Sequence, residues 1–345
     1  MDITVIQGRA ARAASMHLVK AILPSLLWLA IALLSLWSIA ALYIDIRIPI
    51  LRIPLVVVFV AAVISLVSTR RSPFAMLLCF ACCGCVLVWW FNLQPSNQSA
   101  WRPDVSRTTW IAIDGDRVTI HNFRNCDYRT ETSYTNCWTE KTVYLSQLNG
   151  ADFFLDTWGP RWIAHPIVSF QFGDRDHVAF SIEARYKANQ SYSAILGFFR
   201  QYELILVTAD ERDVIRVRTN YRKAEEMYMY RTTASPGTAL KVFVSYVDYV
   251  NQLRNQPQWY NALSRNCTTT LDNQIAAAFP NPHAWSYQLI LNGSLDGLLY
   301  ARNRLVTGGL PFEELREREP INQAARAADQ SPDFSALLRV GRIGF

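Results

Sequence analysis

The chain has 345 residues, enough for one or two domains, with 51% hydrophobic residues and a formal net charge of +6 at pH 7. The hydrophobic fraction is slightly above that of an ordinary globular protein, and a basic net charge is weak evidence for any partner. The sequence lacks a phosphate-binding G-x-x-x-x-G-K-[ST] loop, a G-x-S-x-G nucleophile elbow and an H-E-x-x-H zinc motif. Aromatic and basic residues are not interleaved on one element, so we expect no nucleic-acid partner.

Three uncharged runs near the N-terminus predict membrane-spanning helices at about residues 21–44, 53–68 and 72–93. The first run is long enough to cross about 30 Å of hydrocarbon. It exceeds the apolar core of a secretory signal peptide, and two further apolar runs follow it, so we expect a membrane anchor and not a cleaved leader.

Flanking basic residues predict the orientation of these spans, because Lys and Arg are enriched on the cytoplasmic side. Basic residues precede the first span and join the second span to the third. The residues concerned are Arg9, Arg12, Lys20, Arg70 and Arg71. We therefore expect residues 1–20 in the cytoplasm, residues 21–93 in the inner membrane of a bacterium as a multi-pass region, and residues 94–345 in the periplasm.

The exported part begins with patterns typical of strands and ends with patterns typical of helices. An Asp-Gly turn at 114–115 separates two alternating runs, which predicts a β-hairpin. Further strands, rich in β-branched and aromatic residues, are expected at 161–172, 177–185, 202–208 and 213–219. Apolar residues at helical spacing predict helices at 237–255 and 268–278. The fold class is therefore α+β.

The seven cysteines divide by location. Four lie in the third span, where a thiol behaves as a small hydrophobe and a metal site is not expected: Cys79, Cys82, Cys83 and Cys85. Cys126 and Cys137 lie close together in a compartment that permits disulfides, and a bridge between them is one interpretation. Cys267 is then the odd thiol, either buried and inert or kept for its reactivity.

Cys267 stands at the start of a predicted helix. A nucleophilic thiol is commonly activated by a helix N-terminus and a nearby histidine. Asn266 and Thr268 are cap-type residues, and the helix dipole there favours a negatively charged sulfur. The competing interpretation is a cysteine that merely packs at a helix start.

The exported part offers four histidines as the base: His121, His165, His177 and His283. The pattern alone leaves open the choice between His165 and His121. Strand alternation places His165 on the same face as Ser169. Glu183 is a carboxylate within an apolar strand, where a charge is unfavourable unless an ion pair or hydrogen bond compensates it. It either orients the histidine, as in a catalytic triad, or forms a salt bridge with Arg185 or another arginine.

The most charged stretch of the exported part lies at 210–222. Its arginines include Arg212, Arg216 and Arg218. One interpretation is a solvated turn and strand with ion pairs. The other is a set of guanidinium groups that holds lipid headgroups.

Several strings together resemble the periplasmic domain of Lnb-type lipoprotein N-acyltransferases. The strings are 114–131, 158–172, 178–186, 197–222, 259–271 and 321–342. This family looks like a circularly permuted papain-type fold, related to NlpC-like peptidases and lecithin-retinol acyltransferases, in which the histidine strand precedes the cysteine helix. In Lnb-type enzymes the membrane helices follow the soluble domain, whereas here three precede it.

The resemblance implies that Cys267 is the nucleophile, His165 the base and Glu183 the orienting residue. From the cap positions beside Cys267 and the shared strand face with His165, we expect Asn266, Thr268 and Ser169 to support the site. A phospholipid would donate the acyl group through a thioester on Cys267, and the amine of a lipoprotein would accept it, without a cofactor. The alternatives are a cell-wall amidase or peptidase that uses the same residues, and a catalytically silent membrane-tethered binding domain.

Overall fold

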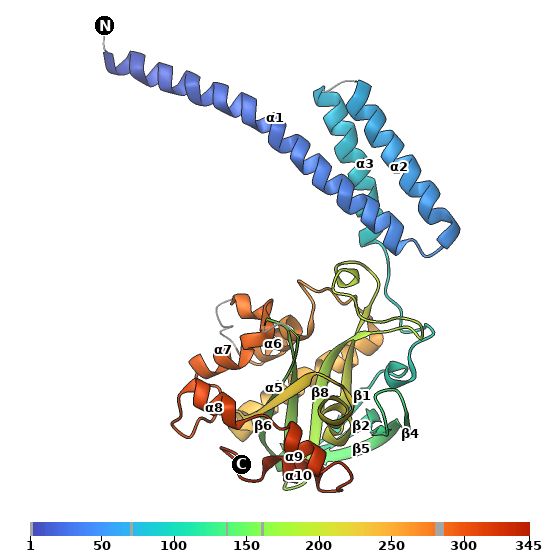
Figure 1. The fold of residues 1–345 in the computed structure, drawn as a ribbon, viewed down its shortest axis with the longest axis vertical. Helices are drawn as coiled ribbons and strands as arrows, with labels where there is room; N and C mark the ends of the chain where they lie inside the picture. The colour runs from blue at the N-terminus through green and yellow to red at the C-terminus, as the bar shows by residue number, and fades with distance from the viewer. Residues whose placement is uncertain (1–2, 70–71, 136, 160–161, 280–285) are drawn as a thin grey trace. The chain divides into compact units, whose positions relative to one another are not determined.

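The computed structural model describes residues 3–69, 72–135, 137–159, 162–279 and 286–345, with the backbone alone for 3–21 and 69 (Figure 1). The chain divides into two compact units. The first consists of residues 1–94 with 199–201, and the second consists of 95–198 with 202–345.

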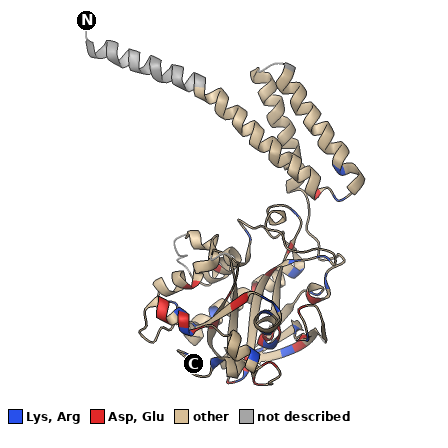
Figure 2. Cartoon of the chain, viewed as in Figure 1, with Lys and Arg blue, Asp and Glu red and all other residues tan. Residues whose placement is uncertain are grey.

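The first unit contains three helices that are long and apolar enough to cross a membrane. They are α1 (Ile3–Asp45), α2 (Pro49–Thr69) and α3 (Pro73–Phe91). Few charged side chains lie on their described parts (Figure 2). The apolar parts of these helices, Ile22–Asp45, Pro49–Ser68 and Pro73–Phe91, lie within a few residues of the predicted spans. The helix α1 itself begins earlier, at Ile3. The predicted orientation depends partly on Arg70 and Arg71, which lie outside the described residues.

The second unit is built on one eight-stranded sheet. Its order is β1-β2-β9-β8-β7-β6-β10, and β5 pairs with β2 off this path. The strands are β1 (Trp110–Asp114), β2 (Arg117–Arg124), β5 (Trp138–Tyr144), β6 (Leu148–Trp158), β7 (Ala164–Phe172), β8 (Asp176–Arg185), β9 (Glu203–Ala209) and β10 (Glu225–Arg231). A separate short pair is formed by β3 (Asp127–Tyr128) and β4 (Tyr134–Thr135). The β1–β2 hairpin and strands β7, β8 and β9 confirm the prediction from alternation.

Strands β5, β6 and β10 were not expected from the sequence. β6 lies between β7 and β10 and carries Asp152 and Asp156, both buried. β10 contains two glutamates and two methionines, residue types with little preference for strands. In β6, buried arginines pair with both aspartates, Arg339 with Asp152 and Arg218 with Asp156. The pattern of a single strand does not reveal such long-range partners.

The strand predicted at 213–219 is wrong. This segment forms the short helix α4 (Glu211–Val214) followed by a π-helical turn at Val217–Tyr221. The Asp210 carboxylate accepts a hydrogen bond from the Arg212 backbone N–H at 3.0 Å and caps α4. The β-branched residues of this segment are buried between packed elements, so their composition reflects burial and not an extended backbone.

Helices cover both faces of the sheet, as alternation along the strands requires (Figure 1). One face buries Phe170 and Phe180 against α5 (Pro236–Asn255), and α6 (Cys267–Ala277) and α7 (Leu295–Ala301) add to this layer. The opposite face packs against α9 (Asn322–Ala327) and α10 (Phe334–Arg339). A further helix, α8, spans Phe312–Arg318. The predicted α5, α6 and α+β class are confirmed, and so is the disulfide between Cys126 and Cys137.

Candidate functional site

The N-terminus of α6 presents Cys267 as the first residue of the helix. The Asn266 side chain accepts hydrogen bonds from the backbone N–H groups of Thr268 and Thr269, each at 2.9 Å. The Thr269 hydroxyl accepts in return from the Asn266 backbone N–H at 2.9 Å, which completes a capping box. These reciprocal bonds fix where α6 begins and hold the thiol, 8% exposed, at the positive end of the helix dipole.

The antiparallel register of β7 and β8 pairs Ile167 with Ser181. Two residues before Ile167 and two residues after Ser181, the same register places His165 opposite Glu183. The Ser181 hydroxyl lies 2.7 Å from His165 Nε2 and donates to Glu183 Oε1 at 2.7 Å. Since Ser181 gives its proton to the carboxylate, Nε2 must donate to Ser181. This polarity leaves the other ring nitrogen of His165 available to Cys267, which is among the groups that raise the pKa of the histidine.

The electrostatics of the site favour a charged imidazole. Burial opposes the charge on His165, but the Glu183 carboxylate and the hydrogen bonds with Cys267 and Glu183 outweigh it and raise the pKa of His165 to about 9. Burial likewise opposes the charge on Glu183, yet Arg218 and His165 hold the pKa of its carboxyl well below the usual range. The pair is therefore an imidazolium and a carboxylate at neutral pH.

A second carboxylate flanks His165 on its other side. Asp156 on β6 is the direct cross-strand partner of His165. Burial raises the pKa of Asp156 well above its ordinary value, although Arg218 opposes this shift. Arg218 reaches both acids: Nη2 donates to Glu183 Oε1 at 2.7 Å, and Nε lies 3.2 Å from Asp156 Oδ2. Arg218 thus fixes the carboxylate that holds the histidine.

The structure contradicts the headgroup-binding interpretation for Arg216 and Arg218. Both side chains are buried. Arg216 Nη2 donates to Asp127 Oδ1 at 2.6 Å, and Nη1 donates to the Asp329 carbonyl at 2.7 Å. Guanidinium groups engaged in this way inside the fold are not available to a lipid headgroup. Arg212 is half-buried, and its assignment stays a prediction.

Asn292 is a residue of the site that sequence reasoning missed. It lies in a short 3-10 turn, Asn292–Ser294, far along the chain from both catalytic candidates. Its side-chain amide accepts from the Ala164 backbone N–H at 2.7 Å and donates to the Ala164 carbonyl at 2.6 Å. It also donates to the Thr268 hydroxyl at 2.7 Å and lies 3.8 Å from Cys267 Sγ. One amide therefore joins the residue before the histidine to the residues at the helix start.

Ser169 does not support the thiol. It lies four residues along β7 from His165, about 13 Å in an extended strand, and pairs with Asp152. A fully buried ionic cluster occupies this part of the sheet, where Arg339 bridges Asp152 and Glu211 with contacts of 2.6 and 2.7 Å. Ser169 was expected on the same face of the strand as His165, but the distance of four residues along β7 separates it from Cys267 and His165.

Three residues of this cluster could together ligate a metal ion. The ligand atoms of Asp152, His177 and Glu211 lie within 4.8 Å of one another. The guanidinium of Arg339 contacts both carboxylates and supplies the positive charge that a cation would bring. We interpret this cluster as the ionic attachment of α10 to the sheet.

The alternative base, His121, has other partners. Its ring stacks on Trp110 with 3.6 Å between centroids, and its Nδ1 lies 2.7 Å from Glu140 Oε2. Among the described histidines, His165 is the one whose environment includes Cys267. His283 lies outside the described residues.

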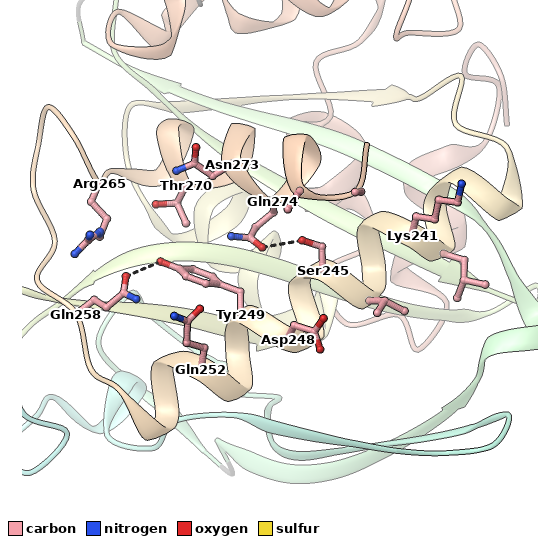
Figure 3. Close-up of a pocket in the computed structure, with 14 residues that line it drawn as sticks. Lys241, Ser245, Asp248, Tyr249, Gln252, Gln258, Arg265, Thr270, Asn273 and Gln274 are labelled. Atoms are coloured by element: carbon pink, nitrogen blue, oxygen red, sulfur yellow. Dashed lines mark hydrogen bonds between the residues drawn. The ribbon is translucent and has the colours of Figure 1, made fainter. Parts of the chain in front are cut away.

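Two hollows lie along α6. A polar groove of about 790 Å³ separates α5 from α6 and is lined by side chains that include Ser245, Tyr249, Thr270 and Gln274 (Figure 3). Two hydrogen bonds cross it, from Ser245 to Gln274 at 2.9 Å and from Tyr249 to Gln258 at 3.1 Å. An apolar cavity of about 250 Å³ touches α5, α6 and α7.

A comparison with protein families matches residues 134–294 to the Lnb N-terminal periplasmic domain. This range includes His165, Glu183, Cys267 and Asn292, so all four members of the hydrogen-bonded site lie in the matched segment. No match was found among curated proteins or among solved structures.

Proposed function

Because the chain carries an Lnb N-terminal periplasmic domain at residues 134–294, we propose that it is a membrane-anchored thiol acyltransferase of the bacterial inner membrane. Its three apolar helices anchor a periplasmic domain beside lipid substrates. The observation that carries the proposal is the chain of two contacts of 2.7 Å from His165 through Ser181 to the half-buried Glu183, in a site where Cys267 is among the groups that raise the pKa of His165. The chain order His165, Glu183, Cys267 supports a circularly permuted papain-like fold.

The first half-reaction transfers an acyl group to the protein. The Cys267 sulfur, its proton held by His165, attacks the ester carbonyl of a phospholipid and forms a carbon–sulfur bond. The ester C–O bond then breaks, and the His165 imidazolium gives its proton to the departing alcohol. The products are a thioester on Cys267 and a lysophospholipid.

The second half-reaction transfers the acyl group to an amine. The amine nitrogen, at the N-terminus of a lipoprotein, attacks the thioester carbonyl while His165 takes its proton. The carbon–sulfur bond breaks, and the proton returns to the sulfur. In both halves the carbonyl oxygen becomes negatively charged, and we assign the Cys267 backbone N–H at the start of α6 as its donor, since Asn266 engages those of Thr268 and Thr269.

The proposal is tested with the full chain in detergent, a phosphatidylethanolamine donor and a synthetic peptide with a free N-terminal amine and an S-linked diacylglyceryl group. We expect an amide-linked acyl group on the peptide by mass spectrometry, formed by wild type but not by Cys267→Ala. Fatty acid released without any acylated peptide would contradict transfer to an amine.

The polar groove favours a second candidate, an amidase or peptidase of cell-wall peptides. Its amide and hydroxyl side chains suit the backbone of an extended peptide, and water would then replace the amine as acceptor. Release of soluble fragments from peptidoglycan by wild type, lost in Cys267→Ala, supports this candidate. Intact peptidoglycan after incubation removes it.

A further inference from the structure

Cys267 heads a stripe of apolar residues on α6. Leu271 and Ile275 follow it at intervals of four residues, the spacing that places side chains on one side of a helix. Phe279 comes four residues later, just beyond the last helical residue, Ala277. Cys267 and Leu271 belong to the same buried apolar cluster, and Ile275 packs against it. The stripe therefore leads from the sulfur into the apolar layer between the helices and the sheet.

The three residues after Cys267 in this stripe line the apolar cavity. The opposite walls come from α5, through Ala239 and Val242, and from α7, through Leu298. By the rise of an α-helix, the lining on α6 begins about 6 Å from Cys267, at Leu271, and continues to about 12 Å, at Ile275. Phe279 lines the cavity just beyond the end of the helix. The cavity thus runs lengthwise along the helix that presents the sulfur.

The size and chemistry of the cavity select a narrow apolar occupant. An apolar cavity of about 150 Å³ accommodates benzene, so by proportion 250 Å³ accommodates about ten carbon atoms. Its α6 and α7 walls are mainly leucine and isoleucine, which offer no hydrogen-bond partners, while polar residues such as Asp272, Thr232 and Arg302 form a smaller part of the lining. An unbranched hydrocarbon chain fits these walls, and burying each methylene there contributes about 0.8 kcal/mol.

We propose that this cavity holds the acyl chain of the Cys267 thioester, with the methylene groups following Leu271, Ile275 and Phe279, and that it sets the preferred chain length. The inference rests on the proposed acyl-transfer function and specifies the donor as a lipid with a long unbranched chain. The polar groove on the other flank of α6 is left for the acceptor.

The first test measures chain-length preference. Ile275→Trp narrows the cavity without touching the hydrogen-bonded site. We expect it to lower formation of the Cys267 adduct from a 16-carbon phospholipid at least tenfold, and from an 8-carbon phospholipid less than threefold. Ala277→Trp, two residues further along α6 on the polar groove, is the matched control and leaves both rates within threefold of wild type. Equal loss for both chains in Ile275→Trp would overturn the inference.

The second test locates the chain independently of catalysis. In the Cys267→Ala background, a 16-carbon fatty acid with a diazirine near its methyl end is irradiated with the full chain, and cross-linked peptides are mapped. We expect cross-links to residues 271–279 and 295–299, reduced at least tenfold by Ile275→Trp and retained in Ala277→Trp. Leu298→Trp, on α7, repeats the comparison from the opposite wall.

The two tests separate failure of this inference from failure of the proposed function. Absence of a wild-type adduct with every chain length contradicts the acyl-transfer function, while the cross-links still report where a chain binds. Two results would overturn the proposal that the cavity holds the chain. One is the absence of cross-links at 271–279 and 295–299, and the other is a cross-linking yield that neither Ile275→Trp nor Leu298→Trp lowers.

Discussion

His165 Nε2 and Glu183 Oε1 lie 3.5 Å apart across adjacent strands, and the Ser181 hydroxyl bridges them with two contacts of 2.7 Å. The bridge fixes which ring nitrogen of His165 faces the carboxylate and which faces Cys267. Under the proposed function, this lone carboxylate in an apolar strand is the group that orients the base. Its salt bridge is to Arg218, not to the neighbouring Arg185.

Glu183→Gln should change how the reaction depends on pH. Removing the carboxylate lowers the pKa of His165 from about 9 toward its usual value near 6.5. Since the reaction uses the imidazolium to protonate the leaving group, we expect the alkaline limb of the rate profile to move down in pH, with about a 10–100-fold lower rate at pH 8. A pH profile of thioester formation measures this shift.

Glu140→Gln is the matched control for this change, because Glu140 contacts the other strand histidine, His121. Its profile should coincide with that of wild type. An unchanged alkaline limb in Glu183→Gln would contradict the orienting role of Glu183.

The ion pair also predicts how stability depends on pH. The folded pKa of His165 is above its unfolded value, so its contribution is complete below about pH 6.5 and is lost as pH rises through about 9. The folded pKa of the Glu183 carboxyl lies below its unfolded value. Its contribution to stability is therefore complete above about pH 4.3 and is lost as pH falls toward the folded pKa. The pair therefore stabilises the fold most between about pH 5 and 6.5.

Denaturant unfolding of the full chain checks this prediction. We expect the stability difference between wild type and His165→Gln to shrink by about 3 kcal/mol between pH 6 and pH 10, the amount that corresponds to the raised pKa. A difference that stays constant over this interval would show that the imidazolium is not stabilised by its neighbours.

Asn292→Ala should slow the reaction by more than its loss of stability explains. The variant leaves the Ala164 backbone groups and the Thr268 hydroxyl without their partner, which costs about 1–3 kcal/mol of stability. It also releases the attachment between β7 and α6, so we expect thioester formation to slow at least tenfold beyond any loss of folded protein. Single-turnover rates at a temperature where both proteins are folded measure the effect.

Asn251→Ala is the control, because the Asn251 side chain makes the same pair of backbone hydrogen bonds at a position outside the site. Asn251 accepts from the Ile111 backbone N–H at 2.9 Å and donates to the Ile111 carbonyl at 2.8 Å, on β1. It should lose similar stability while keeping the wild-type rate. Equal slowing in both variants would mean that Asn292 acts through general stability alone.

Local patterns predicted the elements that hold Cys267 and His165, the proposed nucleophile and base. Alternation predicted β7 and β8, and the polar residues before an apolar run predicted the start of α6. These features depend on residues a few positions apart. The sequence also suggested that Cys267 is the odd thiol outside the Cys126–Cys137 disulfide, as the structure shows. The reactivity of Cys267 stays a prediction.

The parts that could not be predicted depend on long-range pairing. Asn292 lies on a short turn without a pattern, and its role appears only when the fold brings it beside Ala164 and Thr268. Arg218 looked like a surface arginine because nothing local marks Asp156 and Glu183 as its partners. The segment at 213–219 has the residue pattern of a strand because its β-branched residues are buried, although it is helical. The aspartates of β6 interrupt the apolar pattern by which a buried strand is recognised.

The disulfide should stabilise the fold without affecting catalysis. Cys126 and Cys137 close a short loop and pack with Tyr128 and Val217 in a small separate cluster. Loop-closure entropy predicts that replacing both cysteines by alanine costs about 3 kcal/mol. Thermal unfolding with and without reductant measures this cost. A melting temperature that the replacement leaves unchanged, or a rate that falls more than threefold, would contradict the prediction.

The central claim is that Cys267 becomes acylated with His165 as its base. Intact-protein mass spectrometry of the full chain after incubation with phosphatidylethanolamine tests it most directly. We predict one acyl adduct on wild type that hydroxylamine removes, no adduct on Cys267→Ala, and at least a hundredfold slower formation in His165→Gln. An adduct of equal yield on Cys267→Ala, or no adduct on wild type, would contradict the account.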